Sequence, residues 1–526
     1  MKSLSRSIVL ALLLVTSPRL LAQAGGPIPM SLGDTLLSTL SQPSWPVRMK
    51  ADGLGNKSLL CVENWNGHNG HEIVLRILKF DPTATTRIYS DVLIDEAAFV
   101  NVDIAVAADG TAYVIHEDSI SKVTAAGSLV LNWAALNFVG RAIEIDSLSN
   151  LYVSGERNGD AVWAKVDSSG NMILTQSLTG SGLDYASAVA LSPSATTLIL
   201  VGRTDSSDFQ TLAAIQPTFG GGSDAFIARF DTSSGALLSS TYLGGSGFDE
   251  AHAVKVSSNG DIAVAGETDS ANFPIATALQ PTPAGGRDAF VTRTNPTSSA
   301  LMYSSYLGGT GDEQAFGVSI DAVSNMTITG VTYSTDFPLV RSAVTTREGH
   351  WQAFLSRVDH TGAAYQFSTY QSGGSNFFFV GFDLVDDPLN GLFMAANANS
   401  YSGGGSSNGR VRRFSPYQTI PLFDTSKQSK QDPLIQIQLQ DLLGVNRSST
   451  GLVVTTGYVT ARGDPSDVRK TLTGSFIFDR NLQYGHSVKG GYKYTLDRTG
   501  LPAGDYDLIF YVGSPSIFGT VSFSLK

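Results

Sequence analysis

Runs of alternating hydrophobic and polar residues follow one another along most of the chain. "DAFIARFD" from Asp224 and "DAFVTRTN" from Asp288 put apolar side chains on one face and polar ones on the other. This period of two, with aromatic and β-branched residues, predicts β-strands. Turn signals such as Asp231-Thr-Ser-Ser-Gly end the runs. No segment after the N-terminus combines helix formers with a 3.6-residue period, so the pattern predicts an all-β protein.

The strands belong to a unit that repeats. "GRTDSSDFQ" begins at Gly202, "GETDSANFP" at Gly266 and "GVTYSTDFP" at Gly330, which places the three phrases 64 residues apart. Each unit contains four alternating runs joined as a meander, and four-stranded units repeated along a chain predict a β-propeller. The glycines are expected to give the backbone room at a strand end, and the Thr two residues later in each phrase to bond locally.

Related strand pairs begin near residues 47, 101, 141, 187, 252, 316 and 380, which predicts seven blades. The pattern leaves open whether the "DAF" strand is the innermost or the third of its blade. The strings from "DAFIARFD" to "ETDSANFP" and from "DAFVTRTN" to "TYSTDFP" resemble the bacterial SBBP (seven-bladed β-propeller) repeat family. That resemblance implies a seven-bladed β-propeller in an exported bacterial protein, and it implies no common catalytic residues.

The residue composition and the repeat pattern change after Phe423. "DTSKQSKQDP" reads as a polar linker, and alternating runs such as "GLVVTTGYVTA" then continue for about a hundred residues, which predicts a β-sandwich. The stretch "YKYTLDRTGLPAGDYDLIFYV" resembles bacterial Ig-like modules. The expected domains are a signal peptide (1–24), a lead-in segment (25–46), the propeller (47–423), the linker (424–433) and the Ig-like β-sandwich (434–526).

The first residues predict export. Lys2 and Arg6 precede the apolar run Ile8–Val15, and Ala22-Gln23-Ala24 offers a cleavage site. We therefore expect a secreted, periplasmic or cell-surface protein without membrane insertion after cleavage. The single cysteine, Cys61, lies in an apolar run and is expected to be a buried thiol. The net charge of −11 argues against nucleic acid and selects no other class of partner. Carbohydrate or a cell-surface protein is the expected partner.

Successive connections of a meander alternate between the two faces of a propeller. The Gly-rich acidic loop and the excursion of about twenty residues after each phrase are two connections apart, so they share one face, here called the elaborated face. Longer loops carry function more often than minimal turns. A calcium site is the alternative to solvated acids on this face, yet the acids are not kept from unit to unit, so no cofactor is expected. Its candidate ligands are Asp205, Asp208, Asp269 and Asp336.

Signals for catalysis are few, because the chain has no nucleophile elbow, zinc-protease motif or phosphate-binding loop. His252 differs from Ser187 and Phe316 at the equivalent positions, and it lies beside Asp249 and Glu250. A broken symmetry of this kind is what a catalytic acid–base pair would produce, although drift produces it too.

The least regular loop is "ENWNGHNGHE", from Glu63 to Glu72, on the same face. Its aromatic ring and polar groups are those that a sugar site uses, with a metal site and an ordinary polar loop as the alternatives. The residues concerned are Asn64, Trp65, Asn66, His68, Asn69 and His71. The sequence thus favours a secreted, non-catalytic binding or scaffold protein for polysaccharide or a surface protein. A polysaccharide lyase or hydrolase and a structural adhesin are the alternatives.

Overall fold

The computed structural model describes most of the propeller and the strands of the C-terminal part. Every described element is a β-strand. No helix in the described part of the chain is long and apolar enough to cross a membrane. The described residues are 31–36, 44–67, 70–82, 87–95, 101–321, 324–340, 342, 344–347, 351–371, 377–387, 391–400, 408–414, 417–421, 434–441, 454–461, 464–471, 477–479, 491–495, 501, 504–512 and 517–525.

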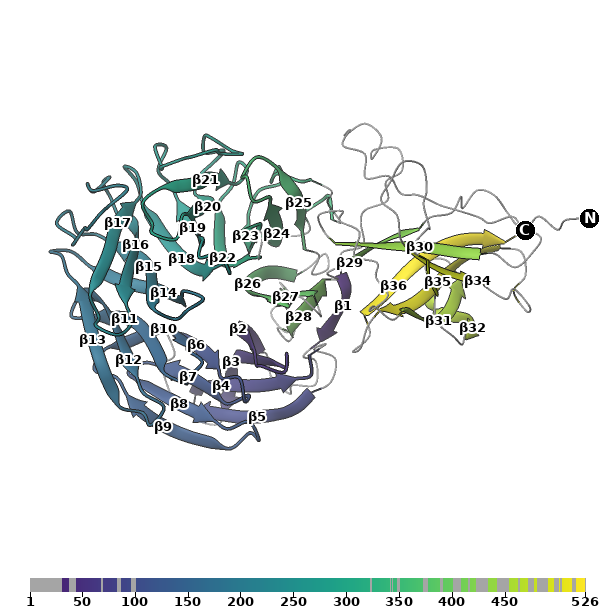
Figure 1. Cartoon of the computed structure of the whole chain (residues 1–526), viewed down its shortest axis with the longest axis horizontal. Coiled ribbons are helices and arrows are strands. Elements are labelled where there is room, and N and C mark those ends of the chain that lie inside the picture. Colours follow the sequence, from purple (N-terminus) through teal and green to yellow (C-terminus); the bar gives the residue numbers. More distant parts are fainter. Residues whose placement is uncertain are drawn as a thin grey trace, which may run out of the picture.

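Six antiparallel sheets are each built from four consecutive strands and form six blades (Figure 1). The first three blades contain β2 (Ser44–Ala51), β3 (Lys57–Gly67), β4 (Gly70–Phe80) and β5 (Arg87–Asp95); β6 (Val102–Val106), β7 (Ala112–His116), β8 (Ser119–Val123) and β9 (Leu129–Ala135); β10 (Val139–Ile145), β11 (Leu151–Arg157), β12 (Asp160–Val166) and β13 (Met172–Leu178). The next three contain β14 (Asp184–Leu191), β15 (Thr197–Thr204), β16 (Asp224–Asp231) and β17 (Leu237–Leu243); β18 (Asp249–Val256), β19 (Ile262–Thr268), β20 (Asp288–Thr294) and β21 (Leu301–Leu307); β22 (Glu313–Ile320), β23 (Met326–Thr332), β24 (Gln352–Val358) and β25 (Tyr365–Tyr370).

The first strand of each blade is the innermost. Strands β2, β6, β10, β14, β18 and β22 contact one another in series, and each begins the order of its sheet. The "DAF" strands β16 and β20 are therefore third in their blades, which settles the phase that the sequence leaves open.

One further sheet of the ring is composite. Strands β26 (Phe377–Asp387), β27 (Gly391–Ser400) and β28 (Asn408–Phe414) follow the sixth blade, and the fourth strand is β1 (Ser31–Leu36) from near the N-terminus. β1 pairs antiparallel with β28. β26 contacts both β22 and β2, so this sheet lies between the last and the first blade (Figure 1). Six blades are thus formed by consecutive strands, one fewer than the sequence predicts, and the remaining sheet joins distant parts of the chain.

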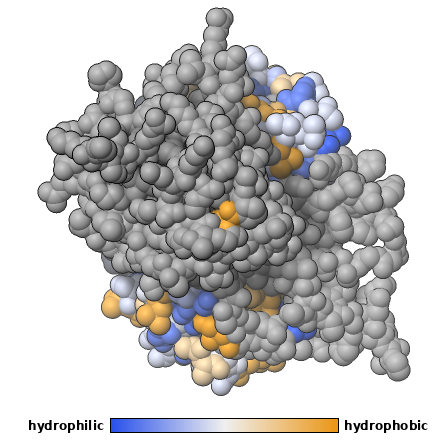
Figure 2. Space-filling model, turned by 90° about the vertical axis from the view of Figure 1, so that its right-hand side faces the viewer, coloured by the Kyte–Doolittle hydropathy of each residue, from blue (hydrophilic) through white to orange (hydrophobic). Residues whose placement is uncertain are grey.

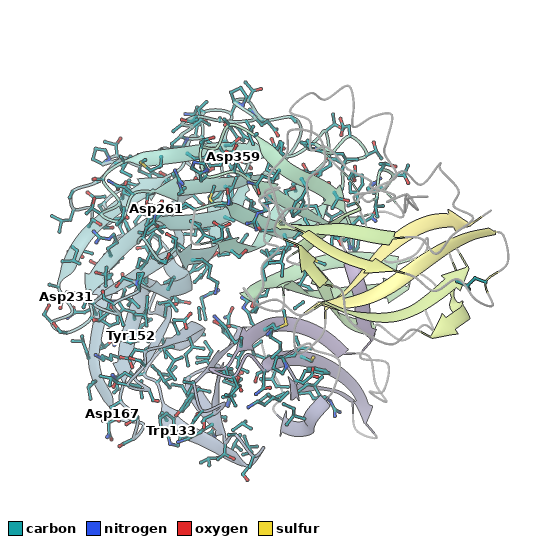
Figure 3. All side chains as sticks on the ribbon, turned by 45° about the vertical axis from the view of Figure 1, so that its right-hand side comes forward. Trp133, Tyr152, Asp167, Asp231, Asp261 and Asp359 are labelled. Carbon is teal, nitrogen blue, oxygen red and sulfur yellow. The ribbon has the colours of Figure 1, made fainter. Side chains whose placement is uncertain are left out.

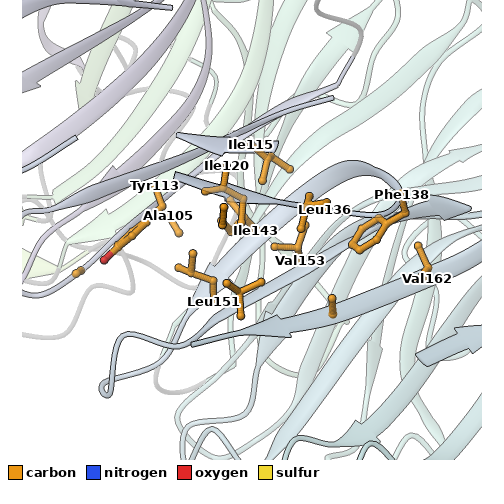
Figure 4. Close-up of a cluster of buried hydrophobic side chains, with 14 residues drawn as sticks. Ala105, Tyr113, Ile115, Ile120, Leu136, Phe138, Ile143, Leu151, Val153 and Val162 are labelled. Carbon is orange, nitrogen blue, oxygen red and sulfur yellow. The ribbon is translucent and has the colours of Figure 1, made fainter. Parts of the chain in front are cut away.

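The hydrophobic core is divided into layers between neighbouring blades. Between the blades that start at β6 and β10, for example, Ile115 and Ile120 meet Ile143 and Val153, all buried (Figure 4). Both faces of a blade are therefore apolar, one for each neighbour, and not apolar on one side and polar on the other as the alternation predicts: Phe226 of β16 lies in one layer and Ile227 in the next. Cys61 is a buried thiol, as expected, in the layer that brings β27 against the first blade.

The strands after residue 416 form two further four-stranded antiparallel sheets, in the orders β29-β30-β34-β33 and β32-β31-β35-β36. Their bounds are β29 (Tyr417–Pro421), β30 (Leu434–Asp441), β31 (Val454–Ala461), β32 (Asp464–Thr471), β33 (Ile477–Asp479), β34 (Gly491–Thr495), β35 (Gly504–Val512) and β36 (Ile517–Leu525). The predicted signal peptide and linker lie outside the described residues.

Tight turns occupy the face opposite the elaborated one. Asp167, Asp231 and Asp359 each accept hydrogen bonds from backbone N–H groups two to four residues ahead, and Asp167 and Asp231 lie towards the rim of the ring in Figure 3. These are the turns that the sequence signals predict. The part of the surface that is coloured in Figure 2 mixes hydrophobic and hydrophilic residues in small patches.

Candidate functional site

The repeated glycine phrase positions the inner strands around the axis. Strands β10, β14, β18 and β22 each bulge by one residue opposite a glycine of the next strand, as at Ala251/Ala253 beside Gly266. A Cβ at Gly266 would meet the carbonyl oxygen of Glu250, and one at Gly202 would meet that of Tyr185. The glycines therefore give the backbone the expected room. The bulge turns the extra residue, here His252, towards the axis.

The bulge residues of several blades line one cavity, which we call the axial mouth. Its volume is about 330 Å³, and it lies at the start of the inner strands, on the elaborated face. It is lined by Arg48, Asn101, Val102, Arg141, Ser187, Glu250, His252, Phe316 and Phe382. Deeper in the channel Lys50 pairs with Glu144 at 3.3 Å and Arg48 Nε lies 3.4 Å from Asp103, so charged side chains fill the axis below the mouth.

His252 stands between two carboxylates. Its Nε2 lies 3.2 Å from Glu267 Oε1, and its Nδ1 lies 3.5 Å from Glu250 Oε1. Burial alone would lower the pKa of His252, but the hydrogen bond to Glu267 and the charge of Glu250 raise it above its usual value. A carboxylate near each ring nitrogen favours the protonated imidazole, with Nε2 donating to Glu267.

Glu267 is the centre of this network. Arg287 Nη1 and Gln314 Nε2 donate to its Oε2 at 2.9 and 2.7 Å. Burial would raise the pKa of Glu267, but these bonds and the one from His252 lower it to about 2. Glu267 could have been noticed in the sequence because it departs from the repeat: Arg203 and Val331 hold the equivalent positions in the other two phrases. Sequence reasoning missed it because 15 residues separate it from His252 and only strand pairing brings the two together.

The prediction that Asp249 assists His252 is wrong, whereas Glu250 does lie beside it. Successive residues of a strand point to opposite sides, and Asp249 is fully buried on the other side. It accepts hydrogen bonds from Gly245 N at 2.7 Å and Ser270 Oγ at 2.8 Å. Thr204 likewise donates to the equivalent acid Asp184 at 2.6 Å. Asp249 therefore holds the loop that enters β18, and Asp184 ties the start of β14 to the end of β15.

The four candidate calcium ligands do not converge. Asp205 pairs with Arg203, and Asp269 accepts from Phe248 N. Asp208 and Asp336 each accept a backbone N–H from the loop that enters the same blade, from Ser181 and Thr310. Asn272 does the same for Ser246, which explains why an amide replaces the acid there.

One group among the described residues has the composition of a metal centre. The ligand atoms of Glu250, His252 and Glu267 lie within 4.8 Å of one another. Arg287 and Gln314 already occupy one oxygen of Glu267. Each ring nitrogen of His252 already faces a carboxylate. A divalent ion would have to displace the proton of His252, so the arrangement favours the imidazolium ion pair over a metal.

The segment proposed as a sugar loop is more regular than the sequence suggests. Asn64, Trp65 and Asn66 belong to β3 and His71 to β4, and the two strands pair up to Gly67–Gly70. His68 and Asn69 lie outside the described residues. The expectation of an irregular loop is therefore wrong, since strand pairing continues to the tip. The hairpin joins the second and third strands, which places its tip on the elaborated face, and its role in binding stays a prediction.

Comparisons with known proteins add no assignment. No protein-family model and no curated protein matches the chain, so the resemblance to SBBP repeats stays a prediction. Solved structures with some likeness include a gluconolactonase from Xanthomonas campestris (11% identity, 71% of this chain and 98% of that one, TM-score 0.34). Others are the Dos1 propeller (7%, 71% and 95%, TM-score 0.39) and Sqt1 from Chaetomium thermophilum (11%, 92% and 98%, TM-score 0.39). Likenesses this remote carry no argument about function.

Proposed function

We propose that this chain is an exported, non-catalytic binding protein that recognises acidic polysaccharide at the axial mouth. The observation that supports this most is Arg141, which lines the cavity with no ion pair among the described residues, whereas Arg48 is balanced by Asp103 and His252 by Glu250 and Glu267. A guanidinium group is well suited to bind the carboxylate of a uronic acid through paired hydrogen bonds.

The guanidinium group of Arg141 is preorganised to bind such a carboxylate. Its guanidinium carbon lies 4.1 Å from the centre of the Tyr185 ring, and one terminal nitrogen donates to Asn101 at 3.3 Å. Its Nε has no hydrogen-bond partner among the described residues. The ring and Asn101 hold the guanidinium in place, which lowers the entropy lost when a carboxylate binds.

An apolar wall completes the mouth. Phe316 and Phe382 stack with ring centres 6.1 Å apart, and both line the cavity. Sugar rings pack their C–H faces on aromatic side chains while polar groups take the hydroxyls. Asn101 and Ser187 offer such polar groups in the same cavity.

The test is titration calorimetry with trigalacturonate. We expect binding to the parent protein and a loss of about tenfold or more for Arg141→Ala, because charged groups at the centre of a site contribute most. Arg229→Ala is the matched control, since Arg229 bonds to Thr297 O away from the mouth. If trigalacturonate does not bind, or binds Arg141→Ala as tightly, the mouth is not an acidic-sugar site; capture of a surface protein would then favour the scaffold role.

A polysaccharide lyase is the second candidate, because an acid–base dyad, His252 with Glu267, lies beside cationic groups in a cavity. The hydrogen bonds of the two groups argue against a lyase. His252 Nε2 is bonded to Glu267, and Glu267 accepts three hydrogen bonds, so neither of these atoms is a free base. Incubation with polygalacturonate decides between the two functions: the appearance of unsaturated, ultraviolet-absorbing ends would show a lyase.

Three features of the chain complete the proposal. We infer that the composite sheet is a seventh blade that β1 closes, and that the two C-terminal sheets form an Ig-like sandwich. We also infer that export is directed by residues 1–24. N-terminal sequencing of protein collected outside the cytoplasm should begin after Ala24, and an intact Met1 would contradict export by cleavage.

A further inference from the structure

A second cavity opens on the elaborated face between the fifth and sixth blades. Its volume is about 510 Å³, and none of its lining residues belongs to the axial mouth. The residues come from the loops and strand ends around β19, β20, β22 and β23. They are Asp269, Gly286, Arg287, Asp312, Gln314 and Tyr333.

Tyr333 is the unusual member of this set. Its side chain is 41% exposed, and its ring lies 5.5 Å from that of Trp351, tilted by 46°. The equivalent positions in the fourth and fifth blades hold Asp205 and Asp269. An exposed tyrosine supported by a tryptophan from a separate loop forms a rigid, flat apolar surface at the edge of a cavity. Such a surface suits the C–H face of a sugar ring.

Polar groups with unused bonding capacity surround this surface. Asp312 Oδ1 accepts from Arg287 N at 2.9 Å, and Asp269 Oδ1 accepts from Phe248 N. The Oδ2 atom of each acid accepts no hydrogen bond from any described residue. Gln314 donates through its amide nitrogen to Glu267 at 2.7 Å, which directs its carbonyl oxygen elsewhere. The cavity therefore presents acceptors in several directions, as a group of sugar hydroxyls requires.

The charges decide the class of sugar. Asp269, Asp312 and the neighbouring Glu267 are carboxylates, whereas Arg287 is the one guanidinium among the cavity's residues. This excess of negative charge repels a uronic acid. A calcium ion is disfavoured as well, since the positive charge of Arg287 acts on both Asp269 and Asp312.

We propose that this cavity binds a neutral pyranose unit, with its ring on Tyr333 and its hydroxyls on Asp269 and Asp312. The proposal rests on the proposed function only in that both concern polysaccharide. Glu267 links the two sites, because it accepts from His252 of the mouth and from Arg287 and Gln314 of this cavity. One polymer that contains acidic and neutral sugars can therefore contact both.

The test measures binding of cellohexaose, maltohexaose, mannohexaose and xylohexaose by calorimetry to the full chain. We expect at least one of them to bind, and Tyr333→Ala to weaken it by about tenfold or more, as for a central aromatic anchor. Tyr333→Phe keeps the ring and should bind within about threefold of the parent. Asp205→Ala, at the equivalent repeat position in the fourth blade, is the matched control and should leave binding unchanged.

Separate outcomes address the two sites. If Arg141→Ala loses trigalacturonate but keeps the neutral sugar, both assignments hold and the sites are distinct. If no neutral hexaose binds, or if Tyr333→Ala binds as tightly as the parent, the second site is refuted whatever trigalacturonate does. Calcium binding that Asp312→Asn abolishes, without sugar binding, would also refute the sugar site and assign a cation instead.

Discussion

Replacing Gly266 by alanine tests the packing that shapes the axial mouth. A Cβ there would lie 1.9 Å from Glu250 O and 2.9 Å from Ala251 Cα, whereas real Cβ atoms essentially never come within 3.0 Å of another heavy atom. Relief therefore requires the bulged strand to move by at least about 1.1 Å. Backbone cannot rotate away as a side chain can, so we expect the upper end of the usual overpacking cost, about 3 kcal/mol.

The assay is thermal unfolding followed by near-ultraviolet circular dichroism. A loss of about 3 kcal/mol should lower the Tm by roughly 5 °C in a domain of this size. Gly330→Ala should behave alike, because its Cβ would meet Gln314 O in the same way. Gly140→Ala is the control, since its Cβ would first meet the tip of Leu136 at 3.2 Å. If Gly266→Ala melts within about 1 °C of Gly140→Ala, the bulge is not tightly packed and our account of the repeated phrase is wrong.

Three further outcomes are expected. Burial raises the pKa of Asp224 to about 7, with a contribution from the charge of Asp249, so the folded state holds an extra proton and stability falls as the pH rises from about 4 to 7. In urea titrations, Asp224→Asn should therefore raise the unfolding free energy by about 1–2 kcal/mol at pH 8 and leave it unchanged at pH 4. An equal gain at both pH values would contradict this. Asp383 accepts the buried Met49 N–H at 3.0 Å across the composite sheet and the first blade, so Asp383→Ala should cost about 1–3 kcal/mol of unfolding free energy; an unchanged urea midpoint would argue against closure at this seam. Because the pKa of His252 is raised and its charge attracts anions, trigalacturonate affinity should fall as the pH rises through that pKa, and a flat profile would exclude its part in binding.

Local sequence patterns were sufficient to predict the strands, the turns and the repeated unit. The alternation in "DAFIARFD" and the turn signal after Asp231 depend only on residues close in sequence. The same holds for the elaborated face, because the alternation of connections in a meander follows from the order of the strands. The broken symmetry also singled out His252, which lines the axial mouth, although the pattern did not place it on the axis and grouped it with Asp249 as well as Glu250.

The sequence by itself therefore determined the all-β class, the blade unit and the face with the long loops. Only the tertiary structure decided that Glu250 and not Asp249 faces His252, because the bulge and the strand direction select the side of each residue. It likewise brought Glu267, Arg287 and Gln314 together from different strands, and joined β1 to β28 across most of the chain. Such contacts carry no sequence signal, since they depend on how neighbouring sheets twist and pack rather than on any local period.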